Sequence, residues 1–310
     1  MTDAPEPTRR RMRTRNRVIG IIAAVALLYI AVVALYALSG RVALTGEGNA
    51  TDGKGLPLQI SPEGVDAVAD RMTVGFEIMP RGEYDASDGN GLSLVTPVTL
   101  LVTGTDGART TDFPAGSALS PVQLRFVTEG DVQLWPFDTY TSQSIVAAIP
   151  SDGQNALDLD WTVQSRQVSG WTFDITVAQR QVPVNAYDLT ITAHRAGATV
   201  AFGIVLLALM VVMPVLVLTV SIAVYRGRRK MEPSLMGWIG AMLFATIPLR
   251  TFLPGSPPIG SWIDYLIVLW VIAGLIVGLV IYVLAFVRWS PTAKTPDRTP
   301  PAEDAVQPPG

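Results

Sequence analysis

The sequence predicts a mixed membrane protein in which an extracytoplasmic antiparallel β-sandwich follows one transmembrane helix and precedes three more. Two observations predict this fold class. Hydrophobic residues make up 49% of the chain and charged residues only 16%, which is too apolar for an ordinary soluble protein. Apolar runs lie near both ends of the chain, whereas residues 41–195 alternate between polar and apolar side chains, as half-buried strands do.

Four apolar segments are predicted to cross the bilayer as helices. A hydrocarbon core of roughly 30 Å requires about 20 mostly apolar residues per helix. Three segments meet this requirement clearly, and the third in chain order is shorter and less apolar. The predicted transmembrane helices are residues 18–38, 199–225, 235–252 and 265–287. Ala37 and Ser39 would suit cleavage of a signal peptide, but the first run exceeds the roughly 7–15 apolar residues of such a peptide, so we interpret it as an uncleaved anchor.

Basic residues predict the orientation of these helices. Six arginines lie within residues 1–17, and the loop at residues 226–234 begins with Arg-Gly-Arg-Arg-Lys. Arg and Lys are enriched on the cytoplasmic side of membrane helices, so both termini are predicted to be cytoplasmic and residues 41–195 extracytoplasmic, at the cell membrane. We expect the two basic patches to contact anionic lipid rather than nucleic acid. The proline-rich and charged tail at residues 288–310 is predicted to be disordered.

The β-sandwich is predicted from short alternating segments separated by turn signals. These segments are rich in β-branched and aromatic residues, and no convincing amphipathic helix lies among them. Asp106 and Gly107 form one such signal, because Asp-Gly accepts the positive φ angles of a tight hairpin turn. The predicted strands are residues 72–78, 98–103, 108–113, 122–127, 144–149, 157–163, 171–177 and 187–193.

The most distinctive motif of this domain is Trp135-Pro136-Phe137-Asp138, within residues 131–140. Pro136 fixes φ and removes a hydrogen-bond donor. The two aromatic side chains can close one end of a sandwich, and Asp138 can accept backbone hydrogen bonds at the turn. We interpret the motif as a structural corner. A ligand or ion contact through Asp138 is the alternative.

Two residues just before the second predicted membrane helix and one in its middle are candidates for special roles. His194 and Arg195 lie just outside this helix, where contact with lipid headgroups is expected, and a proton switch at His194 is the alternative. Pro214 lies in the middle of the helix and is predicted to bend it. The bend serves either helix packing or a hinge.

The turn between the last two predicted helices, residues 253–264, carries charged and aromatic side chains at the helix ends. An arginine and an aspartate there can reach the membrane surface or form an ion pair with each other. Charged residues at membrane depth are also candidates for transport. We expect the prolines to stiffen this turn and the turn to contact and dock the sandwich. The residues concerned are Arg250, Pro257, Pro258, Trp262 and Asp264.

The sequence contains no signature of catalysis or cofactor binding. It has no cysteine and a single histidine, which excludes disulfides, thiolate metal sites and His-rich sites. No P-loop, GxSxG elbow, HExxH motif or Rossmann fingerprint occurs. The acidic loop with Asp85 and Asp88 departs from the EF-hand spacing, so a solvated turn is the better interpretation. We therefore predict no cofactor, no metal and no enzymatic activity.

The order of elements, the corner at 135–140 and the turn at 248–264 resemble the actinobacterial membrane proteins catalogued as domain of unknown function 4436. This resemblance covers most of the chain and implies an envelope protein with a large extracytoplasmic domain, without an established activity. A weaker likeness links the corner to pentameric ligand-gated channels, whose sandwich also carries an aromatic-Pro-Phe-Asp turn. Those channels have four helices after the sandwich, whereas this chain is predicted to have three.

We therefore expect an integral cell-envelope protein without catalytic activity, which presents its sandwich for binding or as a scaffold. An envelope protein or a cell-wall component is the expected partner, besides the lipid bilayer. The alternative is a component of a transporter or of an assembly like a ligand-gated channel. Pro214 and the charged residues Arg250 and Asp264 of the outer turn motivate this alternative.

Overall fold

The computed structural model describes most of the segment from residue 55 to residue 289. The described residues are 27, 30, 33, 34, 43, 44, 55–86, 91–107, 110–151, 155–164, 168–181 and 185–289. The predictions for the tail at residues 1–17 and for the tail from residue 290 onward lie outside these residues, as does most of the first predicted membrane helix. The chain divides into two compact units, Met1–Met210 with Pro248–Leu269, and Val211–Ile247 with Trp270–Gly310.

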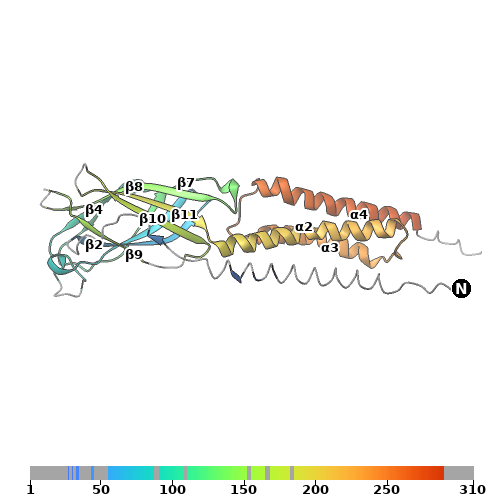
Figure 1. Ribbon diagram of the computed structural model, residues 1–310, viewed down its shortest axis with the longest axis horizontal. Coiled ribbons are helices and arrows are strands. Elements are labelled where there is room, and N and C mark those ends of the chain that lie inside the picture. The colour runs from blue at the N-terminus through green and yellow to red at the C-terminus, as the bar shows by residue number, and fades with distance from the viewer. Residues whose placement is uncertain are drawn as a thin grey trace, which may run out of the picture. The chain divides into compact units, whose positions relative to one another are not determined.

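The first unit contains two β-sheets, as the alternating sequence pattern predicts (Figure 1). The larger sheet follows the order β1 (Ala43–Leu44), β10 (Trp171–Gln179), β11 (Tyr187–Arg195), β8 (Thr139–Pro150), β4 (Val98–Val102) and β5 (Thr110–Phe113), with β7 (Glu129–Gly130) also paired to β8. The smaller sheet follows the order β6 (Val122–Val127), β3 (Arg71–Ile78), β2 (Leu56–Asp66) and β9 (Leu159–Val163).

Most neighbouring strands are antiparallel, which confirms the sandwich-like fold, but two pairs are parallel. β1 pairs with β10 in parallel, and β9 pairs in parallel with β2. Parallel neighbours cannot be joined by a short hairpin and need a long connection. The segment between β2 and β9 supplies such a connection, because it contributes strands to both sheets before β9 returns beside β2.

The core of the sandwich consists of aromatic and branched side chains that alternate with exposed ones. Phe76 and Phe126 are fully buried, and their ring centroids lie 5.9 Å apart. Trp161 and Tyr187 meet edge to face at 5.5 Å. Burial of a large apolar side chain stabilises the fold by about 1.5–3 kcal/mol. Burial and a hydrogen bond to Asp158 raise the pKa of Tyr187 to about 12, so this tyrosine stays neutral.

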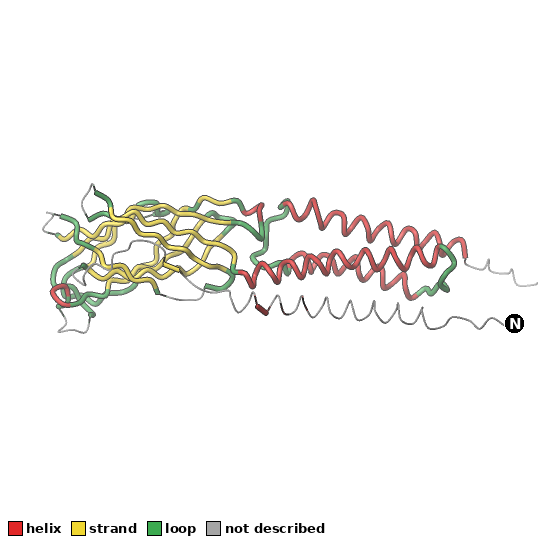
Figure 2. The backbone as a smooth tube through the Cα atoms, viewed as in Figure 1, coloured by secondary structure: helices red, strands yellow, loops and turns green. Residues whose placement is uncertain are grey.

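Three long helices follow the sandwich strands, and Figure 2 shows them in red. They are α2 (Gly197–Tyr225), α3 (Ser234–Thr251) and α4 (Leu269–Trp289), with a π-helical turn, Asp264–Val268, directly before α4. Two stretches among the described residues, Gly197–Tyr225 and Asp264–Arg288, are long and apolar enough to cross a membrane. The last helix extends to residue 289, beyond the predicted end at residue 287, because Val287 and Trp289 continue its apolar sequence.

Glycines allow close packing between α2 and α4 within the second unit. A Cβ atom built on Gly274 would lie 3.0 Å from Cβ of Pro214, and one on Gly278 would lie against the side chain of Val217. Because Gly274 and Gly278 lie one turn apart, they form a shallow face that accepts the neighbouring helix. Pro214 therefore lies at a helix contact, which favours packing as its role, and the hinge stays a prediction.

Candidate functional site

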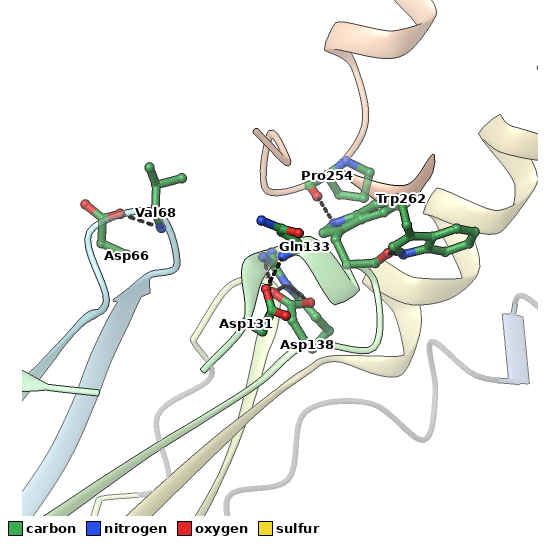
Figure 3. Close-up of polar contacts among 9 residues, drawn as sticks. Asp66, Val68, Asp131, Gln133, Asp138, Pro254 and Trp262 are labelled. Atoms are coloured by element: carbon green, nitrogen blue, oxygen red, sulfur yellow. Dashed lines mark hydrogen bonds and ion pairs between the residues drawn. The ribbon is translucent and has the colours of Figure 1, made fainter. Parts of the chain in front are cut away.

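The predicted corner at residues 135–138 follows two short elements, β7 (Glu129–Gly130) and the 3₁₀ turn η2 (Val132–Leu134), and precedes β8. Asp131 begins the 3₁₀ turn η2, and its carboxylate accepts a hydrogen bond from the backbone N–H of Gln133 at 2.9 Å (Figure 3). The Trp135–Pro136 peptide bond is cis. β8 then starts at Thr139. The motif is therefore a local corner, as its sequence predicts.

Asp138 of the corner forms a buried ion pair with Arg195, the last residue of β11. Nε of Arg195 donates to both carboxylate oxygens at 3.0 and 3.1 Å, and Nη2 donates to Oδ2 at 2.9 Å. The two side chains are only 4% and 0% exposed. The headgroup contact predicted for Arg195 is therefore wrong. Asp138 has a side-chain cation as its partner, where the sequence suggested backbone donors.

Aromatic rings cover this ion pair on the core side. The guanidinium carbon of Arg195 lies 4.1 Å from the centroid of the Trp171 ring. Tyr140 meets Trp171 edge to face at 5.6 Å. Burial and the negative charge of Asp138 raise the pKa of Tyr140 far above its ordinary value. Tyr140 therefore stays neutral, and Arg195 carries the charge that balances Asp138.

Two tryptophans join the corner to the outer turn (Figure 3). The indole N–H of Trp135 donates to the carbonyl of Pro254 at 2.8 Å, and the indole N–H of Trp262 donates to the carbonyl of Trp135 at 2.6 Å. Trp135 is fully buried, and a Cβ atom on Gly203 of α2 would lie 2.7 Å from its ring. The expected contact between the turn and the sandwich is thus present within the first unit.

Phe137 does not help to close the sandwich, although the sequence suggested that both aromatic residues of the corner would. Its side chain is 68% exposed, whereas Trp135 is fully buried. The alternation of β8, carried back from Tyr140 and Ser142, places Asp138 on the buried side and Phe137 on the other. Trp135 has the same parity as Phe137, but it is buried by the outer turn at Pro254 and by Gly203 of α2.

The outer turn is closed by an ion pair of its own. Nε of Arg250 donates to Asp264 at 2.8 Å and Nη2 donates to the second carboxylate oxygen at 3.0 Å. Nη2 also donates to the carbonyls of Pro257 and Pro258 at 3.0 and 3.1 Å. The backbone N–H of Gly260 also donates to the Asp264 carboxylate, at 2.8 Å. The prolines therefore act as acceptors for Arg250 as well as rigid residues.

The backbone of the turn also lies directly against Arg195. Gly255 has a φ of +77°, and a side chain added there would collide with the guanidinium of Arg195. Three segments that are distant in sequence therefore converge: the corner, the junction of β11 with α2, and the outer turn. We call this convergence the corner site, defined by Trp135, Asp138, Trp171, Arg195, Pro254, Gly255 and Trp262.

Other candidate residues lie outside the corner site. Among the described residues, no group of three or more His, Asp or Glu side chains is arranged to hold a metal ion. His194 lies 3.2 Å from Asp174 through Nε2 and 3.2 Å from Thr139 through Nδ1, on the exposed side of the larger sheet. Its role as a proton switch stays a prediction. Asp85 accepts a hydrogen bond from the backbone of Gly91 at 2.8 Å, and Asp88 lies outside the described residues.

Arg195, Trp171 and Gly255 belong to the corner site, and Gly203 contacts it through Trp135, although the sequence did not indicate any of them for this site. For Arg195 the signal was present, because the inward positions of β11 run through Tyr187 and every second residue to Arg195. An aspartate on the buried side of the corner requires a cation nearby. No comparable signal distinguishes the two glycines, whose positions depend on the tertiary contact.

Two family models match the chain. Residues 46–192 match a family described as "Domain of unknown function (DUF4436)", and residues 195–289 match one described as "Domain of unknown function (DUF8686)". No curated protein matches the chain. The boundary between the two matches falls at the end of β11, so the corner lies in the first match and the outer turn in the second.

Proposed function

We propose a function from the geometry of the corner site. Residues 46–192 place the chain in the family described as domain of unknown function (DUF4436), and this description names no activity. The protein is an integral membrane protein of the cell envelope that binds a partner without catalysis, or serves as its scaffold. Its sandwich presents the binding surface outside the membrane. The corner site couples the sandwich to the turn between α3 and α4.

The observation that carries this proposal is the pair of hydrogen bonds between the corner and the turn. Trp135 donates to Pro254, and Trp262 donates back to the carbonyl of Trp135. The buried pair of Asp138 and Arg195 fixes the junction of β11 with α2 beside them. A displacement of the corner would have to break these contacts or carry the turn with it, because packed interiors do not deform continuously.

The charged groups of this region favour coupling over chemistry. Asp138 and Arg195 are hydrogen-bonded to each other, and Asp264 and Arg250 likewise. A carboxylate whose lone pairs are taken by a guanidinium is a poor general base for a substrate. The polar groups are therefore used to hold segments together.

Exposed aliphatic side chains support insertion of the chain in a membrane. Both apolar stretches carry large apolar residues that are at least one-third exposed, as lipid-facing positions do. Examples on α2 are Leu209, Val212, Val215 and Leu216, and examples on α4 are Val277, Val280, Val283 and Leu284. We propose four membrane helices in total, at residues 18–38, 199–225, 235–252 and 265–287, with both termini cytoplasmic.

Hydrogen–deuterium exchange of the full chain in lipid nanodiscs tests the coupling. Trp262→Phe removes the bond to Trp135, and we expect faster exchange in β8 and at residues 131–138 of the sandwich. Trp270→Phe is the matched control, since Trp270 is 68% exposed on α4. Unchanged exchange in the sandwich of the Trp262→Phe protein would contradict coupling through this contact.

Crosslinking in native membranes, followed by mass spectrometry, tests the binding role. A partner should crosslink to sandwich positions reproducibly, and detergent-solubilised complexes should retain it. If crosslinkers of every length tested recovered the protein without a partner, a binding or scaffold function would be contradicted. A reporter fused at Gly255 should appear outside the cell, and its appearance inside would reject the proposed topology.

A transport or channel assembly is the second candidate, and the exposed face of α3 favours it. Exposed positions recur there at spacings of three and four, and four of the seven carry small or weakly polar side chains. These positions are Ser234, Gly237, Ala241, Phe244, Ile247, Pro248 and Thr251. Small residues permit close approach of another helix or of water. Reconstituted vesicles test this function. It is supported if the protein gives an ion flux and Ala241→Leu lowers that flux. It is rejected if vesicles with the protein leak no faster than empty vesicles.

A further inference from the structure

The loop between α2 and α3 is a tightly built turn. α2 ends at Tyr225, Gly227 just beyond it has a φ of +69°, and the backbone N–H of Arg228 donates to the carbonyl of Ala223 at 3.0 Å. The N–H of Gly227 donates to the carbonyl of Val224 at 2.9 Å. This pair of bonds is a Schellman motif, which turns the chain sharply and satisfies the last carbonyls of the helix.

A buried tyrosine of α4 holds the second half of the same loop. Tyr282 is fully buried, its hydroxyl donates to the carbonyl of Glu232 at 2.6 Å, and it accepts from the N–H of Glu232 at 3.3 Å. α3 begins at once, since Leu235 N–H donates to the Glu232 carbonyl at 3.1 Å. The loop is thus fixed to α4 by one hydroxyl group.

This fixed loop exposes four cations within five residues. Arg226, Arg228, Arg229 and Lys230 are all exposed, and no ion pair joins them to another residue in the part of the chain that the structure describes. Arg288 of α4 adds a fifth cation, with its guanidinium carbon 5.6 Å from the Tyr225 ring centroid. Glu232 is the single carboxylate among the described residues of the second unit.

We propose that this basic loop, defined as Arg226, Arg228, Arg229, Lys230 and Arg288, binds the phosphate of an anionic phospholipid headgroup. The inference rests on the membrane insertion proposed above. Charge complementarity supplies the attraction, and guanidinium groups match phosphate oxygens through paired hydrogen bonds. The loop directly follows the apolar stretch that ends at Tyr225, so its cations lie where a lipid phosphate meets the acyl chains.

The apolar residues beside the loop fit the same ligand. Ile222 on the last turn of α2 is 37% exposed, and Val287 on the last turn of α4 is 73% exposed. Ile222 lies four residues before Arg226, about one helical turn, and Val287 directly precedes Arg288. An acyl chain would contact the aliphatic residues while the phosphate contacts the cations. A soluble anion would use only the cations, so the two parts together point to a lipid.

Native mass spectrometry of the full chain released from nanodiscs tests the site. The nanodiscs contain phosphatidylcholine alone or a mixture with phosphatidylglycerol, and retained lipids are counted. We expect the wild-type chain to retain phosphatidylglycerol selectively. Arg228→Glu with Arg229→Glu should lower this retention about tenfold or more. Arg81→Glu with Arg125→Glu makes the same change in net charge at exposed sandwich positions and should leave retention unchanged.

Tyr282→Phe separates a built site from diffuse attraction, since it keeps every cation but removes the hydroxyl that holds Glu232. We expect it to lower retention several-fold. Wild-type retention in Tyr282→Phe, or equal loss in the sandwich control, would overturn the proposal. Displacement of the lipid by millimolar inorganic phosphate would assign the site to free phosphate and would also overturn it. Alkaline carbonate extraction is the separate test of insertion: an extracted chain would reject the proposed function too, whereas an inserted chain without retained lipid would reject only the lipid site.

Discussion

Two arginine–aspartate pairs of similar geometry lie in the first unit, and they differ in what they connect. Arg195 and Asp138 are 57 residues apart, and their side chains are almost completely buried. Arg250 and Asp264 are 14 residues apart, with side chains 14% and 18% exposed. The first pair joins the corner before β8 to the end of β11, at the start of α2, whereas the second closes a turn on itself.

The same pair of groups has different consequences in the two places, because the pairs differ in burial and in their other hydrogen-bond partners. Loss of Arg195 leaves Asp138 buried without a cation, and loss of Asp138 leaves Arg195 buried against the Trp171 ring without a carboxylate, so either loss is costly. Arg250 also donates to two proline carbonyls, and Asp264 also accepts from Gly260, so each keeps partners when the other is removed. We therefore expect the buried pair to control global stability and the turn pair to control local shape.

The largest effect is expected from Arg195→Met, which leaves Asp138 buried without a cation. The free energy of unfolding should fall by about 3–5 kcal/mol. Chemical unfolding of the detergent-solubilised chain, followed by tryptophan fluorescence, measures this change. Adding Asp138→Leu should recover part of the loss, because an apolar pair replaces the buried ions. A loss no larger than that of Arg125→Met, on an exposed strand position, would contradict the role of the buried pair.

A smaller effect is expected from Arg250→Met, about 1–3 kcal/mol, because Asp264 retains its backbone donor. Hydrogen exchange should quicken at residues 257–264 and change little in β8. If exchange in β8 rose as much as in the Arg195→Met protein, the two pairs would not differ in the way that their burial implies.

Two glycines of the outer turn are expected to differ in the cost of replacement by alanine. Gly255 and Gly260 both have positive φ angles, +77° and +96°, so alanine strains the backbone at either position. A Cβ atom at Gly255 would press on Arg195, whereas at Gly260 the nearest atom, the Tyr265 hydroxyl, is 4.0 Å away. Gly255→Ala should therefore cost about 1–3 kcal/mol more than Gly260→Ala. Equal unfolding midpoints would show that Arg195 moves aside freely.

The smallest effect is expected at the exposed pair of Arg71 and Asp106, which are 2.8 Å apart. A hydrogen bond from Arg71 and its charge lower the pKa of Asp106. The contribution of the pair is therefore present above the ordinary pKa of aspartate and is lost as the pH falls through the lowered value. The difference in unfolding midpoint between wild type and Arg71→Ala should be small at neutral pH and disappear in acid. A difference that persisted in acid would point to packing of the Arg71 side chain or to its hydrogen bonds to the carbonyls of Ala69 and Asp70.

The sequence was most informative where contacts are local or periodic. The alternation of β8 and β11 predicts the sheets, and the spacing of Arg250 and Asp264 suggests their ion pair. The same alternation, continued by two residues beyond the predicted strand end at 193, places Arg195 on the buried face, but proximity to a membrane helix favoured a headgroup contact. Phe137 and Trp135 have the same strand parity, and only the tertiary contact of Trp135 with the outer turn makes one buried and the other exposed. The parallel pairing of β2 with β9 depends on a long connection, and no local pattern specifies it.

The junction between the two family matches has a consequence for recombining these domains. Asp138 and Trp135 come from the part matched at residues 46–192, whereas Arg195, Pro254 and Trp262 come from the part matched at residues 195–289. A buried ion pair and two hydrogen bonds therefore connect the two matched parts of the chain. A chimera that joins a foreign sandwich to these helices would need an aspartate and a tryptophan at the matching corner positions. Without the aspartate, Arg195 would be buried with no carboxylate to pair with.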